Sequence, residues 1–215
     1  ATSSVWLDGS STTSSFDPTT GGGGHHGDVY TNGQLKMTGA PRIDGDVTAA
    51  TVLRDPSSVI TGTVQTPLTR ATFMAAALPT GIRDLRAIVA TSGATTTITG
   101  PGSFKASSVT VNNGASLRID NSAGPVTIYV TGAVGVSGGG SIKVADPNPE
   151  KFAVYVLGTS AVTLSDAGTF YGVVYAPTSA ITLTGGGLFT GAFVGKSLSV
   201  SNGANVRYDQ TLRGR

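Results

Sequence analysis

The aspartates are the side chains whose type could support catalysis. The candidates are Asp8, Asp28, Asp44, Asp46 and Asp166, and the only glutamate, Glu150, lies in a Pro-rich stretch. Glycoside hydrolysis needs two carboxylates about 5–10 Å apart across one sugar bond. These aspartates mostly stand in turn-like contexts, where Asp is favoured because it hydrogen-bonds the local backbone. The sequence therefore predicts no catalytic residue and no enzyme, and a polysaccharide-cleaving β-helix is the least favoured alternative.

The histidine pair is the second candidate for chemistry. His25 and His26 are adjacent in a Gly-rich stretch, with Asp28 close by. Metal sites need three or four convergent ligands, and two neighbouring side chains do not easily face one point. His25 falls where the repeat described below expects an apolar residue, so we expect a partly buried structural imidazole. The stretch "IDGDV" lacks the longer ligand series of a calcium loop. No metal and no cofactor are predicted.

The composition indicates a folded chain and argues against several kinds of partner and site. The 215 residues include 31 glycines, 39% hydrophobic and 12% charged residues, whereas disordered chains combine low hydrophobicity with high charge. The net charge of +2 comes without a clustered basic stripe, so no nucleic-acid partner is expected. Cysteine is absent, which excludes disulfides and thiolate sites. No apolar run reaches the roughly 18 residues of a membrane-spanning helix. These features fit an exported protein.

A short phrase recurs through the chain and indicates how such residues would be positioned. It reads apolar, any residue, apolar, small polar, and is followed by a Gly-rich turn. The copies are Leu35–Thr38, Thr96–Thr99, Val109–Asn112, Val134–Ser137, Val162–Ser165, Ile181–Thr184 and Leu198–Ser201, with weaker ones at Val5–Asp8 and Val52–Asp55. Each copy has the alternation of a short strand. We expect Leu164, Leu183 and Val200 to form one inward-facing column.

A second phrase places a glycine between two apolar residues and gives the period. Gly27, Gly45 and Gly62 are 18 and 17 residues apart, and Gly172 and Gly191 are 19 apart. Strands this short cannot bury an apolar face alone, but stacked copies can, as in a β-solenoid. The predicted fold is all-β: one parallel β-helix over residues 1–215, with rungs of about 17–19 residues. A β-sandwich, the alternative, need not repeat a phrase at a fixed period.

Three segments depart from this period. Residues 1–27 are expected to form an opening strand and a Gly-rich loop. Residues 66–88 have the only helical character, with Thr66 and Pro67 as a start and Pro79 and Gly81 as an end, and we expect a helical or irregular excursion on the flank of the solenoid. Residues 145–151 are expected to form a surface loop.

Outward positions of the phrase are rich in hydroxyls. Successive side chains of a strand point to opposite faces, so residues flanking the inward ones point to solvent. The outward set is Thr97, Thr99, Thr110, Thr163, Ser165, Thr182, Thr184, Ser199 and Ser201. Stacked rungs would align these side chains in rows about 4.8 Å apart from rung to rung. Such an array resembles the ice-binding face of some β-solenoid antifreeze proteins, and it favours ice or glycan binding as an alternative function.

The ends of the solenoid are the expected contacts for self-assembly. End rungs expose unpaired backbone groups, and no amphipathic capping helix follows the last copy. The expected assembly residues are Val5, Trp6, Leu7, Val206 and Tyr208. A head-to-tail contact would build a filament, whereas a two-fold contact would close into a dimer. We therefore expect a structural protein that joins or decorates a filament.

Three stretches also resemble a known family. They are "GDVYTNGQLKMTGAPRIDGDV", "FYGVVYAPTSAITLTGGGLFTGAFVGKSLSVSNGA" and the closing "VRYDQTL". They are similar to a β-solenoid domain of unknown function at the C-terminal end of PilX-like, type IV pilus-associated envelope proteins of bacteria, over about Val5 to Leu212. The resemblance implies an extracellular, cell-surface structural domain without catalytic residues. Its implied partners are copies of itself or other envelope and pilus proteins.

Overall fold

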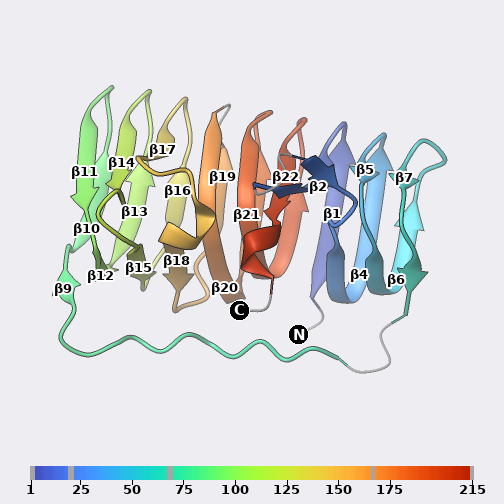
Figure 1. Ribbon diagram of the computed structural model, residues 1–215, viewed down its shortest axis with the longest axis horizontal. Coiled ribbons are helices and arrows are strands. Elements are labelled where there is room, and N and C mark those ends of the chain that lie inside the picture. The colour runs from blue at the N-terminus through green and yellow to red at the C-terminus, as the bar shows by residue number, and fades with distance from the viewer. Residues whose placement is uncertain (1–2, 19–21, 67–69, 166–167, 214–215) are drawn as a thin grey trace.

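The computed structural model shows an elongated stack of β-strand rungs (Figure 1). It describes residues 3–18, 22–66, 70–165 and 168–213. Within these ranges the only helices are two short 3-10 turns, η1 (Pro149–Lys151) and η2 (Gln210–Leu212). The predicted all-β solenoid is confirmed, and its strands pair in parallel except in one small hairpin.

Each full rung passes over three faces of the solenoid. The first face carries β10 (Ala87–Ala90), β13 (Ser108–Val111), β16 (Val134–Val136), β19 (Val162–Ser165), the second halves of β20 (Thr169–Thr184) and β21 (Leu188–Val200), then β1 (Ser4–Gly9) and the second halves of β4 (Val29–Gly39) and β6 (Val47–Arg54). These strands stand in that order along the stack, so the first face is continuous from one end to the other.

The second and third faces complete the rungs. The second face carries β11 (Thr95–Thr99), β14 (Ser116–Asp120), β17 (Ser141–Val144), the openings of β20 and β21, then β22 (Asn205–Asp209), β2 (Thr12–Asp17), β5 (Arg42–Ile43) and β7 (Val59–Ile60). The third face carries β9 (Arg83–Asp84), β12 (Gly102–Ala106), β15 (Val126–Val130), β18 (Phe152–Val156), the middle of β20 and β21, the openings of β4 and β6, and β8 (Val64–Gln65). The strand β3 (Gly22–Gly24) pairs antiparallel with β2.

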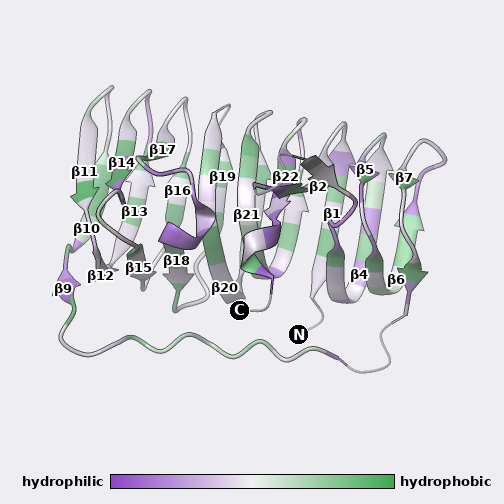
Figure 2. Ribbon diagram, in the orientation of Figure 1, coloured by the Kyte–Doolittle hydropathy of each residue, from purple (hydrophilic) through white to green (hydrophobic). Residues whose placement is uncertain are grey.

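Alternating side chains build the core, as the phrase predicts. Leu164 pairs with Leu183 and Leu183 with Val200, and all three are buried. The expected inward column is confirmed. Hydrophobic and hydrophilic residues alternate along the strands in Figure 2. The period is less regular than expected: Asp46 and Thr63 bond across 17 residues, whereas Ser116 and Ser141 bond across 25. The rungs of β13 and β16 are longer because they carry separate second-face strands and wider turns.

Glycines stack where the second face turns into the third. At Gly191 the backbone φ is +138°, and an added Cβ would lie 1.9 Å from the Gly172 carbonyl oxygen. Gly45 approaches Gly27 in the same way, with an added Cβ 2.8 Å from the Gly27 backbone. Neighbouring rungs come so close at this corner that a side chain does not fit. The glycine phrase of the sequence therefore marks a corner of the solenoid.

The order of rungs in space differs from their order in the chain. β1 pairs with β4 on one side and with β21 on the other, so the first rung of the chain lies in the middle of the stack. Figure 1 accordingly marks both N and C near mid-length. The described ends are the rung of β6, β7 and β8 and the rung of β9, β10 and β11. The opening strand expected within residues 1–27 corresponds to β1 and β2, which supply two faces of an internal rung.

The excursion is extended and irregular, which is one of the two expected forms, and residues 70–82 contain no helix. Residues 70–82 run beside the solenoid from the end rung of β8 to β9 at the other end (Figure 1). A helix rises only about 1.5 Å per residue against about 3.3 Å for an extended chain, so a helical segment would fall short. Tyr175 Oη donates to the Met74 carbonyl at 2.6 Å, which fixes the segment to the third face. Pro67 lies outside the described residues.

Candidate binding face

The outward side chains of the first face between β10 and β21 form one small-residue surface, here called the hydroxyl face. Its central column is Val89, Thr110, Gly135, Thr163, Thr182 and Ser199. A second column is Thr91, Asn112, Ser137, Ser165, Thr184 and Ser201, and a third is Ala87, Ser108, Ala133, Ala161, Ala180 and Ser197. None of these described positions carries a charge. The surface therefore combines two hydroxyl-rich columns with one column of alanine and serine.

Strand register holds the hydroxyls at fixed spacings. Thr163 pairs with Thr182 and Thr182 with Ser199, on neighbouring rungs about 4.8 Å apart. Thr184 stands two residues from Thr182 on the same strand, about 6.7 Å away. Ser201 Oγ donates to Thr184 Oγ1 at 3.3 Å, so the second column is also bonded between rungs. The β-branched threonines restrict their own rotamers, which keeps the hydroxyls in place.

The hydroxyl face stops where the chain's first rung begins. Trp6 continues the central column beyond Ser199, and its indole nitrogen donates to Thr38 Oγ1 at 3.0 Å. The Lys36 ammonium lies 5.7 Å from the Trp6 ring. A large ring, a cation and the carboxylate of Asp8 replace small uncharged side chains there. This change of residue type sets one boundary of the flat surface.

Two of the predicted outward threonines lie on another face. Thr97 and Thr99 belong to β11, where they pair with Arg118 and Asp120 of β14 on the second face. In their rung, the copy of the phrase lies in the second-face strand instead of the first-face strand. The sequence pattern is the same in both kinds of strand. The other predicted hydroxyls, from Thr110 to Ser201, do share the first face. The alanine and serine column was missed, although small residues one position before each phrase were its signal.

The predicted assembly residues lie inside the stack, which corrects their assignment to the solenoid ends. Val5 and Leu7 are buried between the β4 and β21 rungs, while Trp6 keeps 43% of its surface exposed. Val206 and Tyr208 belong to β22, which pairs with β2. Burial raises the pKa of the Tyr208 phenol. Both edges of β1 are therefore paired within the same chain.

The candidate carboxylates connect neighbouring rungs. Asp28 Oδ1 accepts from the Asp46 amide at 2.8 Å, and Asp46 Oδ1 accepts from the Thr63 amide at 2.7 Å. The bonds from Thr63 hold the pKa of Asp46 below its usual value. Asp8 accepts from the Thr38 hydroxyl at 2.7 Å. These groups act as backbone and turn acceptors. Asp166 lies outside the described residues.

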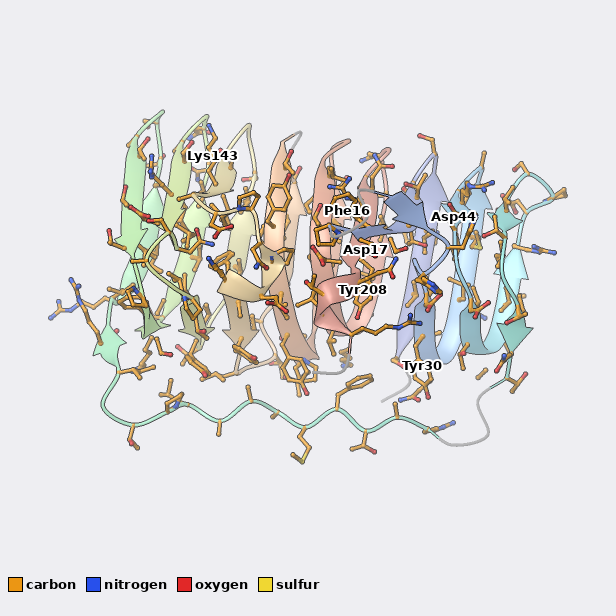
Figure 3. All side chains as sticks on the ribbon, in the orientation of Figure 1. Phe16, Asp17, Tyr30, Asp44, Lys143 and Tyr208 are labelled. Atoms are coloured by element: carbon orange, nitrogen blue, oxygen red, sulfur yellow. The ribbon has the colours of Figure 1, made fainter. Side chains whose placement is uncertain are left out.

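His25 is exposed, which corrects the expected buried imidazole. Its Nδ1 lies 2.8 Å from Oδ1 of Asp44, the residue labelled in Figure 3, and its side chain is 77% exposed. The hydrogen bond from His25 is the main reason that the pKa of Asp44 is lowered. Thr13 of β2 takes a core position instead, where it pairs with Ile43 and its hydroxyl donates to the Gly27 carbonyl at 2.8 Å.

No cluster of three or more metal-ligating His, Cys, Asp or Glu side chains exists among the described residues. Within the same ranges, no helix has the length and apolar character needed to cross a membrane.

Comparison with known proteins identifies the family and the fold. Residues 87–215 match the family described as a domain of unknown function, DUF7305. The chain therefore belongs to this family. A search of curated proteins finds no match.

Two solved structures are similar to the chain. An ice-binding protein from an Antarctic biological consortium is similar with a TM-score of 0.52 and 13% identity, over 94% of this chain and 86% of that chain. An ice-binding protein from the Antarctic ascomycete Antarctomyces psychrotrophicus gives a TM-score of 0.48 and 16% identity, over 94% and 92% of the two chains. At 13% identity, the similarity to the protein from the Antarctic biological consortium shows a shared fold.

Proposed function

We propose that the chain is a non-enzymatic, surface-binding β-solenoid whose hydroxyl face binds an ordered surface, with ice as the first candidate. The hydroxyl face carries the proposal, because it presents small uncharged side chains at fixed spacings over successive rungs. A rigid array loses little conformational freedom on binding, so repeated weak contacts can add up. An ice-binding protein with the same fold supports ice as the ligand. We propose an extracellular location, where such a surface would be met.

Lysines placed on the hydroxyl face should abolish ice binding. We expect Thr163→Lys/Thr182→Lys to lose thermal hysteresis and recrystallisation inhibition, because long charged side chains would hold an ice surface away from the remaining hydroxyls. Both side chains point outward from their strands and are partly exposed. The free energy of unfolding should therefore change by about 0.5 kcal/mol or less per site. The measurement is hysteresis by nanolitre osmometry on proteins with matched melting temperatures.

Thr97→Lys on the second face is the matched control and should keep full activity. Gly135→Thr should raise the activity, since an added Cβ meets nothing within 4 Å and the hydroxyl completes the central column. A parent protein without hysteresis would rule out ice. Sedimentation with insoluble glycans would then test the related carbohydrate ligand with the same variants.

A second proposal is assembly into a filament, in keeping with the resemblance to PilX-like envelope proteins. The observation that favours it is the apolar end rung. Leu53, Val59 and Val64 keep 53%, 41% and 53% of their surface exposed there. Stacking on the rung of β9, β10 and β11 of another copy would cover Val64 and the inward-facing, partly buried Val52 and Ile60, and would pair open strand edges. The contact is therefore proposed for the two ends, instead of the internal rung of Trp6.

Charges on the end rung should prevent such assembly. We expect Val64→Lys to shift any polymer toward monomer, because the lysine would have to lose water at the contact. Negative-stain microscopy and sedimentation velocity over a range of concentrations report the change. The control is Trp6→Lys, which should polymerise like the parent. A parent that stays monomeric at high concentration would contradict the filament proposal.

A further inference from the structure

The rungs fall into two groups that meet at one junction. The N-terminal unit comprises the rungs of β1, β4 and β6 to β8, within residues 3–65, and the C-terminal unit comprises all other rungs, within residues 83–213. The first is blue to cyan in Figure 1 and the second green to red. The family match begins at residue 87, so it covers the C-terminal unit and leaves the N-terminal unit out. The two units are therefore distinct in sequence as well as in the fold.

The junction between the units has a partly polar core. β1 pairs with β21 and β2 pairs with β22 there. On the side of the N-terminal unit, the buried side chains in and next to β2 are those of Ser11, Thr13 and Ser15. On the other side, Leu198 and Val206 point inward but are only partly buried. Burial of apolar surface drives association, so this junction is weaker than the contact of β20 with β21, whose inward side chains are mostly apolar.

Hydrogen bonds complete the junction. The Thr12 amide donates to the Ala204 carbonyl at 3.2 Å, and the Thr12 hydroxyl donates to Asn205 Oδ1. The Ser11 hydroxyl donates to the Val200 carbonyl at 3.2 Å. All of these contacts lie between the surfaces of the two units. The same contacts would form if the two units belonged to different copies of the chain.

The segment that connects the units is stretched. On the third face, β8 and β9 stand nine strand spacings apart, because two spacings separate β4 from β21. At about 4.8 Å per spacing the distance is about 43 Å. Gln65 and Arg83 are 18 residues apart, so full extension reaches about 59 Å, whereas a relaxed flexible chain of that length spans about 25 Å. Closure within one chain therefore costs conformational entropy.

Two contacts tie this connecting segment to the solenoid. The Ala71 amide donates to Asn32 Oδ1 at 2.9 Å, and the Met74 carbonyl accepts from Tyr175 Oη at 2.6 Å. For the described chain, residues 75–82 make no hydrogen bond with the solenoid. This part of the segment can therefore follow another path without losing a bond.

We propose that the N-terminal unit docks on the C-terminal unit of a second copy, and that two copies exchange these units reciprocally to form a dimer. The pairings of β1 with β21 and of β2 with β22 are kept, and a reciprocal exchange closes with two-fold symmetry. The connecting segment then crosses between two solenoids, so it need not follow one of them from end to end. Closure is intramolecular, so dilution favours the monomer and high concentration favours the dimer.

This exchange goes beyond surface binding and does not depend on it. A dimer carries two hydroxyl faces on one particle, which raises the avidity for a surface if both faces can reach it. The exchange also differs from the proposed filament, whose contact lies at the two ends of the solenoid. Val64→Lys on the end rung should therefore leave the exchange unchanged.

Cysteines on the two sides of the junction detect the exchange, because the chain has no cysteine of its own. Copies with Thr12→Cys and copies with Asn205→Cys are unfolded in urea, refolded together at high concentration and oxidised. We expect a disulfide between the two kinds of copy, since these residues are strand partners. The yield should exceed by about tenfold that of a mixture of Thr163→Cys and Thr182→Cys copies, which are partners inside the C-terminal unit and meet only by collision.

A shortened connecting segment tests the role of its length. Deletion of residues 75–82 leaves ten residue steps between Gln65 and Arg83, which reach about 36 Å at most and cannot span the closed distance of about 43 Å. We expect this variant to be a dimer with the circular dichroism of the parent, by light scattering after size-exclusion chromatography. As a control, Thr12→Cys/Asn205→Cys in the full-length chain, oxidised while dilute, should be locked as a monomer until it is reduced.

Three results would overturn the proposal. One is a yield of the junction disulfide no higher than that of the collision control. Another is a shortened protein that folds as a monomer. The third is a series of larger oligomers joined through the same disulfide, because exchange would then be open instead of reciprocal. The cysteine mixture decides alone if the shortened protein does not fold.

Discussion

Leu183→Asp should unfold the C-terminal rungs. Leu183 is fully buried, between Leu164 and Val200 in the inward column of the first face. Removing a buried leucine costs about 2–5 kcal/mol through lost burial and cavity formation. An unpaired carboxylate among apolar neighbours adds several kcal/mol more. The sum is comparable to the whole stability of an ordinary domain, which is about 5–15 kcal/mol.

Circular dichroism and urea titration measure this effect, with Thr182→Asp as the matched control. Thr182 is adjacent in sequence but points outward, so the same carboxylate stays hydrated there. We expect the control to melt close to the parent, while Leu183→Asp loses its cooperative transition or becomes insoluble. Equal melting temperatures for the two variants would show that the inward and outward positions are assigned wrongly.

Gly191→Ala should lower the free energy of unfolding more than an alanine at any other glycine of the corner between the second and third faces. The new Cβ would lie 1.9 Å from the Gly172 carbonyl oxygen, and φ of +138° is a conformation that L-residues rarely adopt. Overpacking of this kind costs about 1–3 kcal/mol, and a strained backbone conformation costs about 1–3 kcal/mol besides. We therefore expect the midpoint of urea unfolding to fall strongly, with the rungs of β20 and β21 forced apart.

Gly135→Ala provides the contrast, because its added Cβ meets nothing within 4 Å. Gly135 lies in β16 on the hydroxyl face, at a strand position that alanine can adopt. Alanine reduces the conformational freedom of the unfolded chain, so we expect the free energy of unfolding to rise by between zero and about 1 kcal/mol. If Gly191→Ala were as stable as Gly135→Ala, the close approach of the two rungs at this corner would be contradicted.

The core and the corner were predictable from the sequence because both depend on short-range patterns. Alternation within Ile181–Thr184 determines which side chains point inward, and stacking needs only that the pattern recur. A glycine between two apolar residues at a repeated spacing likewise indicates a turn that no side chain can occupy. These inferences require no knowledge of which rung lies next to which.

The order of rungs could not be predicted, because every copy of the phrase is a suitable neighbour for every other. Val5–Asp8 resembles Leu198–Ser201 as much as it resembles Leu35–Thr38, and in the structure it pairs with both. The residues of the binding face could not be fully predicted for the same reason. Thr97 carries the phrase but sits on β11, because long rungs present a similar strand on two faces.

The pairing of β1 with β21 has a consequence for the time course of folding. During synthesis the strand around Trp6 is made well before Ser197–Val200, which borders it in the fold. The contact between Thr12 and Asn205 spans 193 residues, and that between Ser15 and Gln210 spans 195. β1 can stack on β4 and β6 early, but its other side stays open until Ser197–Val200 of β21 has been made. Contacts of such long sequence separation form slowly. Closure of this single junction should therefore be the late, rate-limiting event, and the newly made chain should be most vulnerable to wrong pairing at β1.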